Sequence, residues 1–284
     1  MGTNDYKIVN IFNEKVEFKI IDEPHQAKGM PSRGLYFPEP NFGEIAKHYG
    51  LKPGSWKEKI VNLKKPKDLV DVNPLLSCDW VTPLDVKAFR QGKIKICPLV
   101  ACGIVLTKDN YLIINLRGGE LTEEGRNLYG RGFFGLIGGS VTWKEAYKNG
   151  PITDTIDNEF EGELGYFNHK PGKLIGVVDA NGVLPGLKFI STIETDATFK
   201  QLDEANKKSN QLREELLGKG IGESEIKTEL ERKRLPVEAW ESAMLIPIRN
   251  DKKAIENFIN AQKNSFVGSA SGGLMIYAQT LKGD

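Results

Sequence analysis

Alternating apolar and polar positions predict two pairs of β-strands in the second part of the chain. Residues 93–117 form two apolar runs separated by a polar turn at 108–110, a pattern typical of paired strands. Residues 173–195 repeat the pattern around Asn181–Gly182, a dipeptide that favours a tight hairpin turn. Residues 242–248 form a short apolar run, which we expect to be a last core strand.

A helix is predicted over residues 152–166, between the two strand pairs. Its apolar residues recur at a spacing of four and share one helical face: Ile156, Phe160 and Leu164. Thr153 or Asp154 is expected as the N-cap, because either side chain can accept a hydrogen bond from the first turn. Gly165 is expected to end the helix.

Further helices are predicted towards the end of the chain. Residues 200–235 are dense in charge and carry apolar residues at helical spacing: Leu202, Ala205, Leu212, Leu216, Ile226 and Leu230. A glycine-containing break at 218–222 divides them, so we expect a helical hairpin inserted between strands. Residues 251–262 and 272–281 are expected to form closing helices.

This order of elements favours an α+β (α/β) fold with a mixed sheet over a doubly wound fold. Residues 1–92 differ in pattern, since they hold most of the prolines and few long periodic runs. We interpret them as an N-terminal extension or small domain of mixed structure. Residues 93–284 are then the main domain, with 200–235 as its helical insertion.

Composition removes several classes of function. The 39 Lys and Arg residues nearly balance the 38 Asp and Glu residues, and a net charge of +1 argues against a global attraction to nucleic acid or to a membrane. No apolar run approaches the roughly 18 residues that a membrane span needs, and the N-terminal residues lack the apolar segment of a signal peptide. We therefore expect a cytoplasmic protein.

The cysteines and histidines do not predict a zinc site or a disulfide framework. Cys78, Cys97 and Cys102 are too few and too unevenly spaced for either, so we interpret them as buried thiols. The three histidines are scattered along the chain, which argues against a histidine-rich metal site.

Two carboxylates offer the most specific chemistry in the sequence. Glu159 and Glu163 lie four residues apart on the predicted helix and therefore share a face. A glycine-rich stretch at 130–141 precedes them. Clustered oxygen ligands beside such a loop suit Mg²⁺ held together with substrate phosphates. The alternative is an ordinary solvated acidic face of a helix.

The neighbourhood of these glutamates resembles the Nudix box, a motif with the pattern G-x5-E-x7-R-E-U-x-E-E-x-G-U. Seven of its nine fixed positions match: Gly139, Glu145, Glu159, Phe160, Glu163, Gly165 and Tyr166. Two positions depart, since Asn158 stands in place of the arginine and Gly162 in place of a glutamate. The gap between Glu145 and Asn158 is also five residues longer than in the pattern. The resemblance covers roughly residues 93–284 and implies a mixed-sheet α/β/α sandwich.

The resemblance also implies roles for individual residues. Glu159 and Glu163 would be ligands of Mg²⁺ or Mn²⁺, with Glu145 as an outer ligand. A general base is needed within reach of the attacking water, and Glu159, Glu238 and Glu241 are candidates for it. The departures at positions 158 and 162 remove a charge that would hold a box glutamate and one expected metal ligand.

Residues around the glycine-rich stretch are the candidate substrate contacts: Arg117, Arg126, Arg131, Gly138 and Gly139. A guanidinium group can clamp a phosphate as a planar fork, and glycines permit close approach of the backbone. Each arginine taken alone is also compatible with an ordinary surface position.

The leading hypothesis is Mg²⁺-dependent hydrolysis of a diphosphate bond in a nucleoside diphosphate linked to another group. The first alternative is a catalytically impaired Nudix domain that binds a nucleotide, an ADP-ribose-like ligand or a partner protein. The second is an unrelated α+β interaction protein whose motif matches by chance. The sequence does not fix the oligomeric state, and a homodimer is compatible with it.

Overall fold

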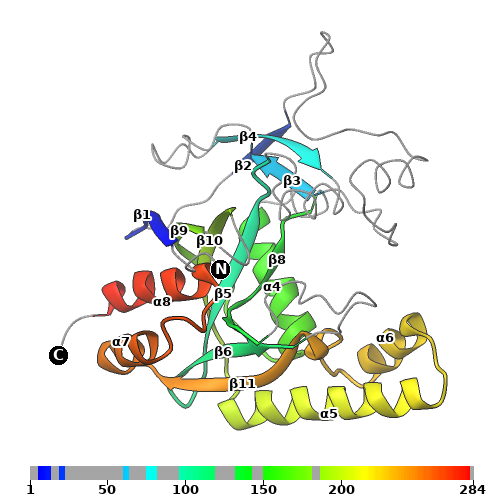
Figure 1. Ribbon diagram of the computed structural model, residues 1–284. Coiled ribbons are helices and arrows are strands. Elements are labelled where there is room, and N and C mark those ends of the chain that lie inside the picture. Colours follow the sequence, from blue (N-terminus) through cyan, green and yellow to red (C-terminus); the bar gives the residue numbers. More distant parts are fainter. Residues whose placement is uncertain are drawn as a thin grey trace.

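The computed structural model describes residues 6–13, 19–22, 60–63, 75–81, 96–118, 132–142, 150–180 and 186–281. Its main feature is an eight-stranded mixed sheet (Figure 1). Six strands follow one another across it: β1 (Tyr6–Ile11), β9 (Lys173–Ala180), β10 (Gly186–Glu194), β5 (Val100–Leu106), β6 (Tyr111–Arg117) and β11 (Ser242–Arg249). Two short strands lie off this path, β7 (Phe134–Gly135) against β6 and β8 (Ile137–Ser140) against β5.

Strand pairing confirms the predicted mixed sheet. The pair β10 and β5 is parallel, whereas β5–β6, β9–β10, β6–β11 and β1–β9 are antiparallel. Strand β1 comes from the region predicted as an N-terminal extension, and it joins the main sheet through its pairing with β9. The boundary at residue 92 stays a prediction, but one strand of the main sheet lies before it.

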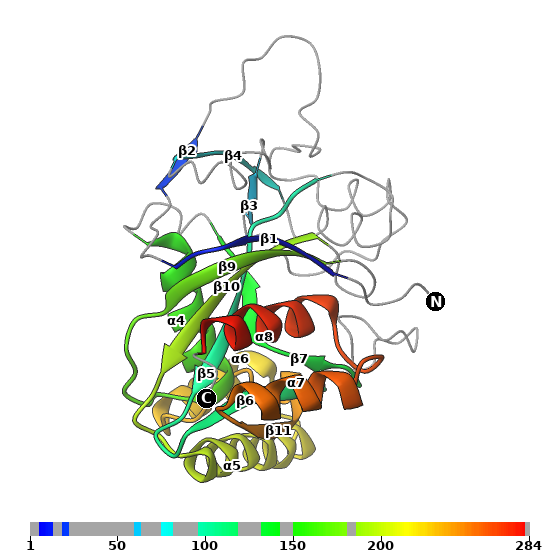
Figure 2. The same ribbon diagram turned by 90° about the vertical axis from the view of Figure 1, so that its left-hand side faces the viewer.

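Helices cover both faces of the sheet and make three layers, as the sequence predicts (Figure 2). On one face lies α4 (Pro151–Leu164). The core on this face includes residues from four strands of the sheet: Val105, Ile113, Val177 and Phe189. On the other face lie α7 (Lys252–Ala261) and α8 (Gly268–Thr280) over the alternate residues: Ile104, Leu112, Val178 and Ile190. This alternation follows from the period of two in a strand.

The ends of α4 confirm one expectation and correct another. The helix ends at Gly165, whose φ of 109° lies in the region that favours glycine. It begins at Pro151 after Gly150, without a side-chain cap, so the prediction of Thr153 or Asp154 as N-cap is wrong. Proline tolerates the first helical position because its missing N–H would have no partner there.

The predicted helical hairpin is formed by α5 (Phe199–Gly218) and α6 (Glu223–Arg232), with the break at 219–222 between them. A 3₁₀ turn, η2 (Ala239–Glu241), then leads into β11. Leu202 of α5 is buried in the core beneath α4, so the hairpin is anchored to the sheet domain.

The last strand differs from its prediction. β11 is an edge strand in the main sheet, paired only with β6 among the described strands, and Met244 on it is 50% exposed. The strand predicted at 242–248 is therefore present, but it lies at the edge of the sheet. Leu245 and Ile248 are buried, whereas Ala243, Met244 and Pro247 are exposed. A short apolar run does not reveal an edge position.

A small second sheet contains β2 (Lys19–Asp22), β4 (Leu75–Val81) and β3 (Ile60–Leu63), in that order. In the sequence, Val16, Phe18 and Ile20 alternate as on one face of a strand. Ile20 lies in β2, whereas Val16 and Phe18 lie outside the described residues. Within the described part of the chain, no helix has both the length and the apolar character that crossing a bilayer requires.

Candidate active site

Glu163 is the best-defined residue of the site. It lies on the last turn of α4 and is only 1% exposed. Its Oε1 accepts a hydrogen bond from the backbone N–H of Gly138 at 2.9 Å, and its Oε2 accepts one from Asn115 Nδ2 at 3.3 Å. Asn115 Nδ2 also donates to Ser242 Oγ at 3.1 Å. Three strands, β6, β8 and β11, thus contribute to the surroundings of one carboxylate.

The glycine pair Gly138–Gly139 brings β8 against these glutamates. Gly138 has φ 151°, and a Cβ atom there would collide with the Ala101 carbonyl of β5. A Cβ atom on Gly139 would overlap the carboxylate of Glu159. Both positions therefore require glycine for close approach. The structure shows these glycines in contact with strand and helix, and their contact with substrate stays a prediction.

Electrostatic interactions link Glu163 to two other carboxylates. Burial raises the pKa of Glu163 well above its ordinary value, and the negative charges of Glu241 and Glu159 raise it further. The charge of Arg117 and the hydrogen bond from Gly138 lower it, but they do not outweigh burial. Glu159, Glu163 and Glu241, which the sequence singled out separately, therefore influence one another electrostatically.

Arg117 reaches the same place from the end of β6. Its guanidinium Nη2 lies 3.6 Å from Glu241 Oε2, and the Arg117 side chain is largely buried. The backbone N–H of Gly118 donates to the Glu241 carbonyl at 2.6 Å, which fixes the turn that carries Glu241. Arg117 is therefore the one predicted phosphate contact that the described structure places beside the glutamates.

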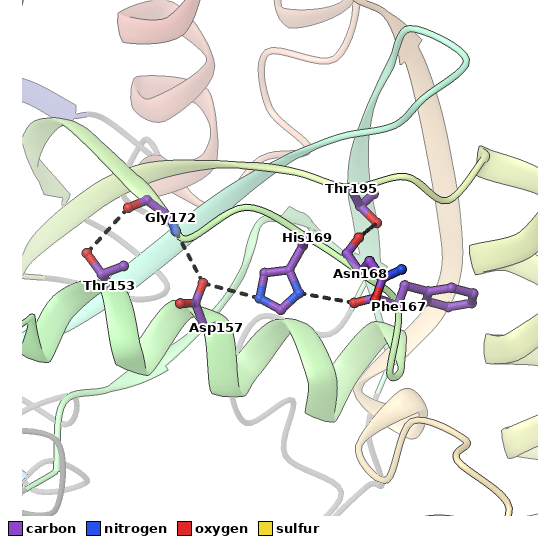
Figure 3. A network of polar contacts seen from close by, with 7 residues as sticks. All are labelled: Thr153, Asp157, Phe167, Asn168, His169, Gly172 and Thr195. Carbon is purple, nitrogen blue, oxygen red and sulfur yellow. Dashed lines mark hydrogen bonds and ion pairs between the residues drawn. The ribbon is translucent and has the colours of Figure 1, made fainter.

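A polar network anchors α4 to the loop that follows it (Figure 3). His169 Nδ1 lies 3.1 Å from the Phe167 carbonyl oxygen. His169 Nε2 lies 3.4 Å from Asp157 Oδ1, which also accepts from the Gly172 N–H at 3.2 Å. The network thus joins Asp157 of α4 to the loop at residues 167–172.

Other predicted site residues lie outside the described residues: Glu145, Arg126 and Arg131. Among the residues that the structure does describe, no three His, Cys, Asp or Glu side chains are arranged as a group that could hold a metal ion. The metal set Glu159, Glu163 and Glu145 therefore stays a prediction.

The residue types are nonetheless those that a hard divalent cation prefers, because carboxylate oxygens are its usual ligands. The negative charges of Glu241 and Glu159 add to the effect of burial on Glu163. In addition, buried Asn115 keeps its Oδ1 without a hydrogen-bond partner. A cation would offset the repulsion that raises the pKa of Glu163.

Sequence reasoning missed Asn115, Ser242 and His169. Asn115 had a detectable signal, because it is a polar residue inside the apolar run of β6 and is almost completely buried. Buried polar residues need partners, so such a position points to a polar centre. Ser242 and His169 stand in less distinctive surroundings in the sequence.

Comparison with known proteins adds little to this site. No family model matches the chain, and no curated protein matches it. Among solved structures, the chain is similar to Tm1382, a candidate Nudix hydrolase, at 13% identity over 54% of this chain and 91% of that chain, with a TM-score of 0.31. Similarity at this level assigns neither family nor activity, so conclusions on function depend on the residues of the site.

Proposed function

We propose that this protein is a Nudix-type hydrolase that cleaves a diphosphate bond in a nucleoside diphosphate linked to another group, with Mg²⁺ or Mn²⁺ as cofactor. The observation that carries the proposal is the packing of Glu159 and Glu163 of α4 against Gly138–Gly139, where buried Glu163 accepts a hydrogen bond from the Gly138 N–H. The negative charge of Glu241, far along the chain, supports it, because this charge and the charge of Glu159 both raise the pKa of Glu163.

Each residue has a distinct part in this proposal. Glu159 and Glu163 hold the cation, which neutralises phosphate charge and makes bound water more acidic. Glu163 is oriented for this by Gly138 and Asn115. Glu241 accepts a proton from the attacking water, and Arg117 beside it binds a phosphate oxygen.

Cleavage of ADP-ribose gives AMP and ribose 5-phosphate, so phosphate must be freed from these products in a second step. A direct test incubates the full chain with ADP-ribose and a panel of other nucleoside diphosphate derivatives, with Mg²⁺ or with EDTA. The reaction is stopped by heat, excess divalent metal is added, and phosphate release by alkaline phosphatase then measures the products. We expect turnover of at least one compound with Mg²⁺, and its loss with EDTA. Equal release under both conditions would contradict the metal-dependent step, and no release from any compound would contradict hydrolysis of this class.

A second function is a binding module that recognises a nucleotide without cleaving it. One observation favours it: both oxygens of Glu163 already accept hydrogen bonds within the protein. These bonds leave fewer lone pairs for a cation. In that case calorimetry would detect ADP-ribose binding while the same protein releases no phosphate.

A further inference from the structure

The carboxylate of Glu238 occupies the space that a side chain at position 162 would fill. A Cβ atom on Gly162 would lie 2.9 Å from Glu238 Oε2 and 3.6 Å from its Cδ. The backbone N–H of Glu238 also donates to the Gly162 carbonyl at 2.8 Å. A side chain at position 162 would therefore displace the Glu238 carboxylate from this place.

Helical geometry sets where this carboxylate lies. Residues three apart on a helix are surface neighbours, so the position above Gly162 adjoins Glu159, one turn earlier on α4. Glu163 is the next residue along the same helix. Glu238 thus brings a carboxylate from another part of the chain to the part of α4 that carries the site.

Helix α5 determines the path of the segment that carries Glu238. Ser209 Oγ donates to the Pro236 carbonyl at 2.5 Å, and Asn206 Nδ2 donates to the Ala239 carbonyl at 3.3 Å. Ser209 and Asn206 are both buried. Because buried polar groups are costly without partners, these two bonds favour one position of residues 236–239 over others.

We propose that helix α5 is a positioning element of the candidate site. Asn206 and Ser209 hold the segment before β11 so that Glu238 supplies the carboxylate that Gly162 lacks. This inference rests on the proposed function, because it gives the helical insertion and Gly162 a role in that site. It also explains why the departure at position 162 need not remove a carboxylate from the site.

The test is Mn²⁺ affinity of the full chain, measured by electron paramagnetic resonance with the metal alone. Glu238→Gln removes the charge, Gly162→Ala displaces the carboxylate and Ser209→Ala removes one of its supports. We expect each to weaken Mn²⁺ binding by about 10-fold or more, the scale of lost supporting interactions at metal sites. Ser224→Ala, an exposed serine on α6, is the matched control and should leave affinity unchanged.

Thermal stability separates positioning from general damage. Alanine favours a helix more than glycine does, so Gly162→Ala should unfold at the same temperature as the native chain or higher, while binding Mn²⁺ more weakly. If Ser209→Ala does not fold, the Mn²⁺ affinity of Gly162→Ala still tests whether the Glu238 carboxylate acts at the site. In the Glu238→Gln background, Gly162→Ala should have no further effect on affinity, because both changes act through one carboxylate.

The outcomes separate this inference from the proposed function. If Glu159→Gln abolishes Mn²⁺ binding while Glu238→Gln and Gly162→Ala bind as the native chain does, the inference is overturned and the metal site remains. If the native chain neither binds Mn²⁺ nor releases phosphate, the proposed function fails, and the inference fails with it.

Discussion

The two faces of the main sheet differ in the polarity of their buried residues. Beneath α4, the core includes a buried carboxylate, Glu163, and a buried amide, Asn115, which are hydrogen-bonded to each other. Beneath α7 and α8, the core is apolar and closely packed, with small residues of α8 lying directly on the sheet. A Cβ atom on Gly272 of α8 would lie 2.7 Å from Val178 Cγ1.

This difference separates a face suited to chemistry from a face suited to stability. Burying an ionised group is unfavourable unless it is paired and hydrogen-bonded, so Glu163 lowers the stability of the α4 face at neutral pH. The α8 face is mostly apolar and gains from apolar burial. Its buried charged residue is Lys188 of β10, which lies opposite Val100 and Val178. Substitutions on the two faces should therefore change different properties.

The largest expected effect is on the α4 face. Glu159→Gln should keep the fold and lower turnover by about 100-fold or more, the usual scale for loss of an electrostatic or acid–base group. Phosphate release on a verified substrate measures it. Glu161→Gln, two residues along the same helix, is the control and should retain turnover. Unchanged turnover in a folded Glu159→Gln protein would remove Glu159 from the mechanism.

The converse effect is expected on the α8 face. Gly272→Val should lower the free energy of unfolding by about 1–3 kcal/mol, because the added side chain meets Val178 and Tyr6 in a packed core. Chemical denaturation measures this, and turnover per folded molecule should stay the same. Loss of turnover with full stability would show that the two faces are not separate in function.

A smaller effect concerns pH and the α4 face without metal. Folding raises the pKa of Glu163. The stability that Glu163 contributes is therefore complete at pH values below its pKa in the unfolded chain, and it is lost as the pH rises through its pKa in the folded chain. Glu163→Gln should remove this loss of stability at high pH, because the amide does not ionise. Asn115 can turn its unpartnered Oδ1 towards the amide N–H of the glutamine.

We expect Glu163→Gln to unfold about 2–4 °C higher than the native chain at pH 8 in EDTA, the shift that roughly 1 kcal/mol produces in a domain of this size. Near pH 4 the two proteins should unfold at nearly the same temperature. Thermal denaturation across this range measures the difference. A native chain that is more stable than the variant at pH 8 would contradict the explanation that burial and neighbouring negative charges raise the pKa of Glu163.

The smallest effect is on thiol chemistry at Cys102, in the core of the α8 face, and at Cys97, which packs against the core of the α4 face. Burial raises the pKa of Cys102 to about 11 and that of Cys97 to about 12. Because the thiolate is the reactive form, both should alkylate slowly at pH 8 in the folded protein and quickly in guanidinium. Peptide mass mapping after iodoacetamide treatment measures this. Rapid labelling of Cys102 in the folded chain would show that the α8 face opens readily.

Local patterns predicted most of the helices and strands. The four-residue spacing of α4 and the charged hairpin of α5 and α6 depend on neighbours in sequence, so a single chain reveals them. The pairing of β1 with β9 and the edge position of β11 depend on distant partners. Period-two patterns do not specify which strand lies alongside, and both features were therefore missed.

The candidate site shows the same limit. Glu159 and Glu163 follow from helical spacing and from the motif, and Glu241 was one of three candidates for a base. The support from Asn115 and from the Gly138 N–H depends on how β6 and β8 pack against α4. The place of Glu238 over Gly162 depends on the contact of α5 with residues 236–239. These contacts join segments that lie far apart in the sequence.

The central claim is that Glu159 and Glu163 hold a divalent cation on the α4 face. The most direct measurement is anomalous diffraction from crystals of the full chain soaked with Mn²⁺ and ADP-ribose. The account predicts a manganese peak within bonding distance of carboxylate oxygens of both glutamates. Crystals with ADP-ribose bound and no manganese at these side chains, or manganese bound only elsewhere, would contradict it.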